Sequence, residues 1–165
     1  MVFRSQALNP DIQRLDALDS GEPSMDTWLS EHASGAEARR VARTFVWTSE
    51  DQTVMAYYSL TGHRIVRDEL PKSVGRGSSS EVPAVLLARL ALDKSLHGQG
   101  LGGVLLADAL ERIVVATQTV AARIVVVDAL HERAATFYEH YGFKRIPGNL
   151  RLVQKVSDVA AALKP

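Results

Sequence analysis

Hydrophobic and polar residues follow two different periods in the second half of the chain. The run 85–92 (VLLARLAL) is almost uniformly apolar, which is typical of a strand buried on both faces. Apolar residues then recur at helical spacing from Leu101 to Ala116, which predicts an amphipathic helix. A second buried strand is expected at 123–127 (RIVVV), and a final strand from about 150 to 156. The pattern therefore alternates strands and helices.

A last helix is expected between these two strands. Its apolar stripe, which is predicted to face the core, consists of Leu130, Ala134, Phe137 and Tyr141. Gly142 follows at the position where a left-handed residue commonly ends a helix. The sequence thus predicts one buried side for this helix and a glycine cap at its end.

The N-terminal part of the chain predicts two helices and a hairpin. One short helix is expected over Asn9–Leu18, and a second from about Met25 to Ala33 with Ser24 as its N-cap. The β-rich runs 43–48 (RTFVWT) and 53–60 (TVMAYYSL) flank a polar turn and predict an antiparallel hairpin. Together with the second half, this order indicates a mixed α/β fold with a partly antiparallel sheet.

Two segments lack a clear periodic pattern. Residues 68–83 (DELPKSVGRGSSSEVP) have the composition of a loop, and so long a loop is expected to be either functional or mobile. The alanine-rich tail from about residue 157 is expected to be loosely ordered. A chain of this length is expected to form a single domain over residues 1–165.

Composition narrows the classes of function. Of the 165 residues, 46% are hydrophobic and 23% are charged, as in ordinary globular proteins. The 19 basic and 19 acidic residues cancel, so no global field attracts the chain to nucleic acids or membranes. The absence of cysteine excludes disulfides, a thiolate nucleophile and cysteine-based zinc sites. Residues 1–6 lack a signal-peptide core and no apolar run approaches membrane-spanning length, so a cytoplasmic protein is expected.

The most informative segment is His97–Gly103 (HGQGLGG), which lies between the first buried strand and the helix that follows it. Glycines at these positions let several backbone N–H groups converge at a helix N-terminus without intervening side chains. Such a turn is expected to bind a phosphate or diphosphate. The chain is therefore expected to bind a cofactor that carries a nucleotide.

Two templates fit this turn. Gly98, Gly100 and Gly103 spell G-x-G-x-x-G, and Asp128 ends the next strand, as in dinucleotide-binding folds that use nicotinamide or flavin cofactors. Two features count against that interpretation. Residues 93–97 separate the glycines from the strand, and too little chain follows Asp128 to complete a doubly wound sheet.

The other template is a diphosphate-binding loop of the form Gln/Arg-x-x-Gly-x-Gly/Ala, which corresponds to His97–Gly102 here. A second motif follows it, Ala134-x-x-Phe137-Tyr138-x-x-x-Gly142-Phe143. With both motifs in this order, the chain resembles the GNAT superfamily of acetyl-CoA-dependent N-acetyltransferases. The resemblance implies the GNAT fold, an α/β fold of the α+β type. Its central sheet is mixed, mostly antiparallel, splayed between its two middle strands and flanked by helices.

Nearly the whole chain is similar to one subgroup, the acetyltransferase toxins of type II toxin–antitoxin operons. The similar segments are 20–29 (SGEPSMDTWL), 43–46 (RTFV), 54–60 (VMAYYSL), 87–93 (LARLALD) and 125–143 (VVVDALHERAATFYEHYGF). The resemblance implies acetylation of the free α-amino group of aminoacyl-tRNA, which stops translation. It also implies inhibition by a ribbon-helix-helix antitoxin and, because relatives are often dimers, a homodimer. No membrane partner is expected.

The resemblance also assigns roles to individual residues. Tyr138 is the candidate general acid, because a phenol with a pKa near 10 can protonate a thiolate whose conjugate acid has a pKa of about 8.5. His97 replaces the usual Gln or Arg, which leaves binding by backbone N–H groups intact, and His131 replaces an Asn that contacts pantetheine. The residues implied to bind acetyl-CoA are Leu90, Ala91, Leu92, His97, Gly98, Gln99, Gly100, Leu101, Gly102, Gly103, His131, Ala134 and Phe137.

The remaining titratable residues give weaker signals. No general base stands out, and an α-amine with a pKa of about 8 needs little help to lose its proton. The histidines show no metal-ligand spacing, so no metal is expected. Arg89, within a buried strand, is expected to be structural and to need a partner. The basic residues that could track tRNA phosphates, if they cluster, are Arg39, Arg40, Arg43, Arg64, Arg67, Lys72 and Arg76.

Two other functions stay open on the sequence alone. The same fold could acetylate a protein N-terminus or a small-molecule amine. Alternatively, the chain could bind acyl-CoA as a regulator without catalysis. Transfer assays separate these functions, because a regulator retains the cofactor but transfers no acetyl group to any amine.

Overall fold

The structure of the protein is a computed structural model that describes residues 3–164. Two predictions extend beyond the described residues. The segment 1–6, expected to lack a signal-peptide core, includes residues 1 and 2, and the expected domain includes residue 165. The strands form a seven-stranded, mostly antiparallel sheet in the order β1-β2-β3-β4-β5-β7-β6, and helices flank it. The expected mixed α/β fold is therefore confirmed.

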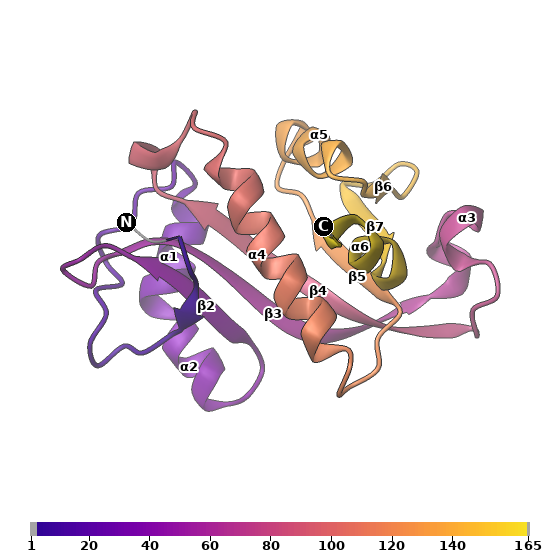
Figure 1. Cartoon of the computed structure of the whole chain (residues 1–165), viewed down its shortest axis with the longest axis horizontal. Coiled ribbons are helices and arrows are strands. Elements are labelled where there is room, and N and C mark those ends of the chain that lie inside the picture. Colours follow the sequence, from indigo (N-terminus) through magenta and orange to yellow (C-terminus); the bar gives the residue numbers. More distant parts are fainter. Residues whose placement is uncertain (1–2, 165) are drawn as a thin grey trace. The chain divides into compact units, whose positions relative to one another are not determined.

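Figure 1 labels the helices and strands in chain order. Their bounds are β1 (Gln6–Ala7), α1 (Pro23–Glu31), α2 (Ala33–Ala38), β2 (Arg43–Thr48), β3 (Val54–Val66), η1 (Arg67–Glu69), α3 (Lys72–Gly75), β4 (Glu81–Leu92), η2 (Lys94–Leu96), α4 (Leu101–Ala116), β5 (Ile124–Asp128), α5 (Glu132–His140), β6 (Lys144–Arg145), β7 (Arg151–Lys155) and α6 (Val156–Leu163). Within the described part of the chain, no helix has the length and apolarity that a membrane crossing requires.

Contacts between residues divide the chain into two compact units. The N-terminal unit comprises residues 3–61 and 88–109, and the C-terminal unit comprises residues 62–87 and 110–164. Both β3 and β4 pass from one unit into the other. Each unit is therefore built from segments that are distant in the sequence.

In the N-terminal unit, β2 pairs antiparallel with β1 and with the first half of β3. The register of β2 and β3 runs from Arg43↔Leu60 to Thr48↔Val54. The turn that joins these strands contains Gln52 at a positive φ of 66°. The predicted hairpin is confirmed, and β3 continues further than the sequence pattern indicated.

Consecutive residues of β3 face opposite sides of the sheet, as the alternation of a strand requires. Tyr57 points to α1, where its hydroxyl donates to the backbone carbonyl of Met25 at 2.6 Å. Tyr58 points to α4, where its hydroxyl donates to the carboxylate of Asp108 at 2.6 Å. Both tyrosines are fully buried. Within this unit, α1 and the first half of α4 therefore cover opposite faces of the sheet.

In the C-terminal unit, β5 runs parallel to β4 and antiparallel to β7. Its four valine and isoleucine residues are buried, as the apolar run predicted. The parallel ladder extends from Ala84↔Ile124 to Leu87↔Val127, whereas β4 itself continues to Leu92. The ladder thus ends before the strand does, which is in keeping with the expected splaying of the middle strands.

The N-terminal segment contradicts one expectation. No helix forms over Asn9–Leu18; instead, a single turn closes on the backbone carbonyl of Asn9, which accepts the N–H group of Gln13 at 3.0 Å. The Gln13 side chain accepts the N–H group of Asn9 in return, at 2.8 Å. Arg14 then pairs with Thr53 in an isolated parallel bridge. Because these bonds satisfy the backbone without further helical turns, the predicted helix is wrong.

Helix α1 begins earlier than expected. Pro23 occupies the first helical position, where the missing N–H group costs nothing. Glu22 is the N-cap and makes no side-chain cap bond, while Ser24 lies inside the helix. The prediction of Ser24 as the N-cap is therefore wrong, because the proline sets the start of the helix.

The segment that resembles a loop has structure of its own. Helices η1 and α3 and the start of β4 occupy most of residues 68–83. Leu70 and Val74 are buried in the core of the C-terminal unit with Val82. The residues after 155, where a loosely ordered tail was expected, form helix α6, and Val159 buries its side chain.

Candidate active site

The glycine-rich turn lies in the N-terminal unit, between η2 and α4. Gly98 and Gly100 adopt φ values of 78° and 75°, which residues with a Cβ rarely adopt. A Cβ at either position would have no heavy atom within 4 Å, so the turn is open on the side that these glycines face. Helix α4 begins at Leu101, and its first N–H groups have no acceptor within the helix. The turn thus has an open, glycine-rich backbone at a helix N-terminus, and anion binding there stays a prediction.

The 3-10 helix η2 fixes the start of this turn. The carboxylate of Asp93 accepts the backbone N–H of Ser95 at 3.0 Å and its hydroxyl at 2.8 Å. It also accepts the backbone N–H of Asp19 at 3.0 Å. Burial alone would raise the pKa of Asp93, but these hydrogen bonds hold it below its ordinary value. Sequence analysis missed this role, although Asp is a favoured residue before a helical turn.

Histidine 97 ties the turn to the preceding strand. Nε2 of His97 lies 2.7 Å from the backbone carbonyl oxygen of Leu92. Within β4, Ala91 is buried while Leu90 and Leu92 are half-buried. The structure thus brings the predicted strand residues 90–92 and the predicted turn 97–103 together in one unit.

The other predicted site residues lie on α5 in the C-terminal unit. His131 is the N-cap of this helix, and its Nδ1 accepts the backbone N–H of Ala134 at 3.2 Å. The imidazole at this position therefore orders the first turn of α5. Ala134 and Phe137 are half-buried, and the Phe137 ring packs edge-on against the Tyr138 ring with centroids 5.3 Å apart.

Tyrosine 138 lies on the buried side of α5. Its side chain is 8% exposed, and its ring packs edge-on against Phe143 with centroids 5.7 Å apart. Burial raises the pKa of the Tyr138 phenol above its ordinary value of 10.0. The hydroxyl therefore keeps its proton at neutral pH, which is the state that a general acid requires.

The stripe that was predicted to face the core forms the more exposed side of α5. Leu130 and Tyr141 are 47% and 41% exposed, whereas Ala135 and Tyr138 are the buried residues of the helix. The helix has nine residues, too few for its period to distinguish two apolar sides. The prediction that Tyr141 belongs to the core is wrong. The prediction that Gly142 ends the helix in the left-handed conformation is confirmed by its φ of 94°.

Arginine 89 has an unexpected partner. Its guanidinium carbon lies 4.1 Å from the centre of the Trp28 ring. Trp28 in turn stacks on Tyr57, with ring centroids 6.0 Å apart and planes within 10°. Burial lowers the pKa of Arg89, and the neighbouring Tyr57 acts in the opposite direction. The partner that Arg89 was expected to need is therefore an aromatic ring.

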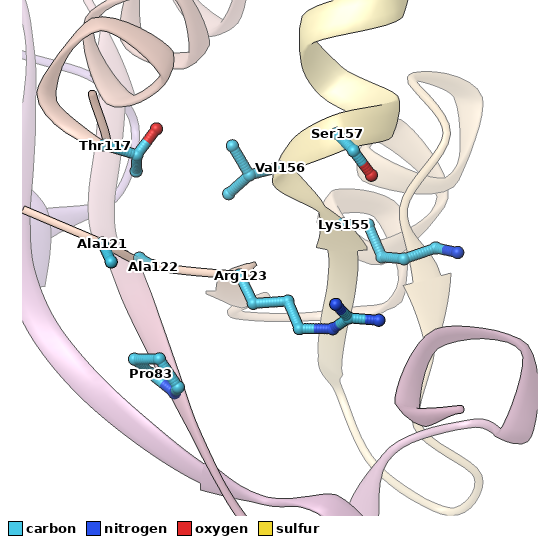
Figure 2. Close-up of a pocket in the computed structure, with 8 residues that line it drawn as sticks. All are labelled: Pro83, Thr117, Ala121, Ala122, Arg123, Lys155, Val156 and Ser157. Atoms are coloured by element: carbon cyan, nitrogen blue, oxygen red, sulfur yellow. The ribbon is translucent and has the colours of Figure 1, made fainter. Parts of the chain in front are cut away.

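A pocket of about 460 Å³ opens in the C-terminal unit, near the starts of β4 and β5. Figure 2 shows Arg123 and Lys155 extending side by side at this pocket. The Arg123 guanidinium donates to the backbone carbonyl of Arg76 at 3.1 Å. None of the residues expected to bind acetyl-CoA or to catalyse its reaction lines this pocket.

The basic residues considered for tRNA binding fall in both units. In the N-terminal unit, Arg43 pairs with Glu37 at 2.6 Å. In the C-terminal unit, Arg64 pairs with Glu81 at 3.4 Å. Such pairs reduce the charge that these arginines offer to phosphates.

A second group of cations, in the C-terminal unit, has no ion-pair partner among the described residues. Lys72 and Arg76 lie on and beside α3, and Nζ of Lys144 donates to the Ser73 hydroxyl of that helix at 3.0 Å. With Arg123, these residues place uncompensated positive charge around α3. Within residues 3–164, no cluster of three or more His, Asp or Glu could hold a metal ion.

Comparison with known proteins gives a match to a family and to a curated relative. The family model described as an acetyltransferase (GNAT) domain matches residues 40–145, which include the glycine-rich turn and α5. The chain is 35% identical over 154 residues to the tRNA-acetylating toxin of Mycobacterium tuberculosis, covering 93% of this chain and 92% of that protein.

Solved structures give the same indication. A structure of AtaT complexed with acetyl-methionyl-tRNAfMet is similar with a TM-score of 0.88 and 28% identity, over 97% of this chain and 98% of that one. Another structure contains AtaT with a tyrosine replaced by phenylalanine, bound to the C-terminus of the antitoxin AtaR and to acetyl-CoA. It is similar with a TM-score of 0.82 and 26% identity, over 98% of both chains. With these matches and the family model over most of its length, the chain belongs to the GNAT family of acetyltransferases.

Proposed function

We propose that this protein is a toxin that transfers the acetyl group of acetyl-CoA to the α-amino group of aminoacyl-tRNA. The observation that carries the proposal is the open glycine turn at the start of α4, where Gly98 and Gly100 adopt positive φ. Similarity to a tRNA-acetylating toxin and to AtaT complexed with acetyl-methionyl-tRNA supports the choice of acceptor. We infer that residues 1–165 form a single acetyltransferase domain.

The residues of the turn fit the diphosphate of acetyl-CoA. Backbone N–H groups of residues 98–103 bind its oxygens, because no Cβ fills the space beside Gly98 and Gly100. Residues 90–92 offer backbone groups to the pantetheine arm, beyond the point where the ladder with β5 ends. Ala134 and Phe137, on the more exposed side of α5, supply apolar contacts, while the His131 ring caps that helix.

Tyr138 supplies the proton that the departing thiolate takes up. The acceptor nitrogen attacks the thioester carbonyl carbon, so that a C–N bond forms and the C–S bond breaks. The phenol of Tyr138 donates its proton to the departing sulfur, and the nitrogen releases to solvent the extra proton that it carries after the attack. The Tyr138 phenolate then regains a proton from solvent, so the reaction is balanced. An α-amine with a pKa of about 8 is substantially neutral at cellular pH, so the chain needs no dedicated general base.

Inhibition by an antitoxin forms part of the same proposal. The structure of AtaT bound to the C-terminus of AtaR supports a protein partner of this kind. We infer that the partner is a ribbon-helix-helix protein encoded beside the toxin, and that the active form is a homodimer.

Substitution of Tyr138 by phenylalanine tests the chemistry. The Tyr138→Phe variant keeps the buried ring and removes the proton, so we expect kcat for charged tRNA to fall by about 100-fold or more. The dissociation constant for acetyl-CoA, measured by calorimetry, is expected to change less than twofold. Tyr141→Phe is the matched control, because Tyr141 is an exposed tyrosine beside the same helix.

The same assay discriminates between acceptors. Wild-type protein is offered charged tRNA, a peptide with a free N-terminus and a small primary amine, each with labelled acetyl-CoA. Preferential transfer to the peptide or the small amine contradicts the tRNA proposal. Retention of acetyl-CoA with no transfer to any amine identifies a regulator instead. An unchanged kcat in Tyr138→Phe removes the role of Tyr138.

A further inference from the structure

The guanidinium of Arg89 has N–H groups that donate no hydrogen bond to any described residue. Among the described residues, its guanidinium makes no hydrogen bond and no ion pair, although the side chain is half-buried. The Trp28 ring stabilises the positive charge, but the N–H donors of the guanidinium remain available to a ligand. Asp26 acts electrostatically on Tyr57, but its carboxylate already accepts the backbone N–H of Ser20 at 3.1 Å and the Ser20 hydroxyl at 2.6 Å.

The aromatic stack orients this guanidinium. The Arg89 guanidinium lies over the Trp28 ring, and Trp28 stacks on Tyr57. The Tyr57 ring is itself fixed, because it is fully buried and its hydroxyl donates to the backbone of α1. A guanidinium carries two parallel N–H groups whose spacing matches that of two phosphate oxygens.

Arg89 lies on the opposite face of the sheet from helix α4, which the glycine-rich turn precedes. Arg89 stacks on Trp28 of α1, so it lies on the same face of the sheet as Tyr57. The glycine turn opens α4, which packs on the opposite face through the bond between Asp108 and Tyr58. Arg89 is also the residue directly before 90–92, the segment assigned to the pantetheine arm.

We propose that Arg89 binds a phosphate near the 3′ end of the acceptor RNA and so positions the aminoacyl group for transfer. This inference rests on the proposed function, since it names the recognition element for that acceptor. The cofactor diphosphate occupies the turn at α4, so the free guanidinium edge on the α1 face serves the other phosphate-bearing substrate. Arg89 is thus a specificity residue that favours an acceptor with a phosphodiester over one without it.

Kinetics of an Arg89→Gln variant test this assignment. We expect KM for charged tRNA to rise tenfold or more while KM for acetyl-CoA changes less than twofold. The slope of log KM for tRNA against log salt concentration is also expected to fall, because one phosphate contact is lost. Each such contact contributes roughly 0.7 to 0.9 to the slope. A merely structural role would not change this slope.

A phosphate-free acceptor provides the second comparison. The ratio of kcat/KM for charged tRNA to that for 3′-aminoacyl-adenosine is measured in wild type and in each variant. Arg89→Gln is expected to reduce this ratio tenfold or more. Arg89→Lys keeps the charge but loses the planar fork and part of the stack, so we expect it to recover only part of the ratio. Arg14→Gln, at an exposed arginine of the same unit, controls for the loss of one positive charge.

The outcomes are distinguishable. Wild type that acetylates charged tRNA, with the same KM in Arg89→Gln, overturns this inference alone. Equal increases in KM for tRNA and for acetyl-CoA overturn it as well, because they assign Arg89 to the phosphates of coenzyme A. Wild type that acetylates no charged tRNA contradicts the proposed function itself. If the thermal transition of Arg89→Gln shows that this variant does not fold, Arg89→Lys is measured instead. A severalfold increase in its KM for charged tRNA supports the inference, and an unchanged KM overturns it.

Discussion

At the scale of single residues, Gly142 determines how α5 ends. Its N–H donates to the carbonyl of Glu139 at 3.1 Å, and the next N–H, of Phe143, donates to the carbonyl of Tyr138 at 3.2 Å. These two bonds form a Schellman motif, which requires the left-handed conformation that Gly142 adopts. A Cβ at this position would lie 2.8 Å from Nε2 of Gln154, so the end of that side chain would also have to shift.

Substitution of Gly142 by alanine is therefore expected to destabilise the protein by about 1–3 kcal/mol. Chemical denaturation measures the change in the free energy of unfolding. Gly62→Ala is the matched control, because a Cβ there meets no atom within 4 Å and the backbone is not in the left-handed region. Equal stability of the two variants would contradict the importance of this cap.

The same scale explains which residues could be predicted from the sequence. Glycines at positive φ, such as Gly98 and Gly142, were predictable because only the backbone decides their conformation. The orientation of α5 was not, since Phe137 and Tyr138 are both aromatic and a nine-residue helix offers two apolar sides. The aromatic stack under Arg89 depends on a contact between α1 and β4, which no local pattern encodes.

At the scale of elements, the short helix η2 joins the end of β4 to the glycine-rich turn and is held in place by Asp93. The carboxylate of Asp93 accepts hydrogen bonds from Ser95 and from Asp19, and these bonds hold its pKa below the ordinary value of 3.8. A depressed pKa in the folded state means that the carboxylate stabilises the fold fully above that ordinary value. The stabilisation is lost as the pH falls through the folded-state pKa.

An Asp93→Asn variant is expected to be less stable than wild type from pH 7 down to about pH 5, by a constant margin. The margin is expected to close below about pH 4, where wild type takes up the proton that asparagine cannot bind. Thermal unfolding across this pH range measures the difference. Asp11→Asn, at an exposed carboxylate on the first turn, is the control. A margin that does not depend on pH would contradict the role of the carboxylate charge.

Long periodic elements were predictable at this scale, and short ones were not. The bounds of α4 match the apolar repeat from Leu101 to Ala116, and the hairpin follows from its β-rich runs. The expected helix over Asn9–Leu18 failed because Arg14 bonds to the hairpin, a partner outside its own segment. Segments such as α3 and β6 are too short to have a period. Helix α3 buries Val74 in the core, and β6 forms by pairing with β7.

At the scale of the whole molecule, the charges balance. With 19 basic and 19 acidic residues, the chain has no net field that would gather RNA without specificity. Sequestration of tRNA by simple binding is therefore a poor explanation for toxicity. The proposed effect on cells must come from repeated acetyl transfer.

Expression in growing bacteria tests this conclusion. Wild type is expected to stop incorporation of labelled amino acids within minutes, whereas Tyr138→Phe at the same protein level does not. Co-expression of the protein encoded by the neighbouring gene is expected to restore incorporation. If the phenylalanine variant stops translation equally well, binding rather than catalysis is the cause.

The passage of β3 and β4 through both units has a consequence for synthesis on the ribosome. Every residue of the N-terminal unit has been made once Ala109 is joined, and the cofactor turn is then complete. The C-terminal unit still lacks β5, α5 with Tyr138, and β7, which pairs with both β5 and β6. A chain that terminates between Ala109 and α5 therefore carries the glycine-rich turn without Tyr138, the proposed general acid, and is expected to transfer no acetyl group.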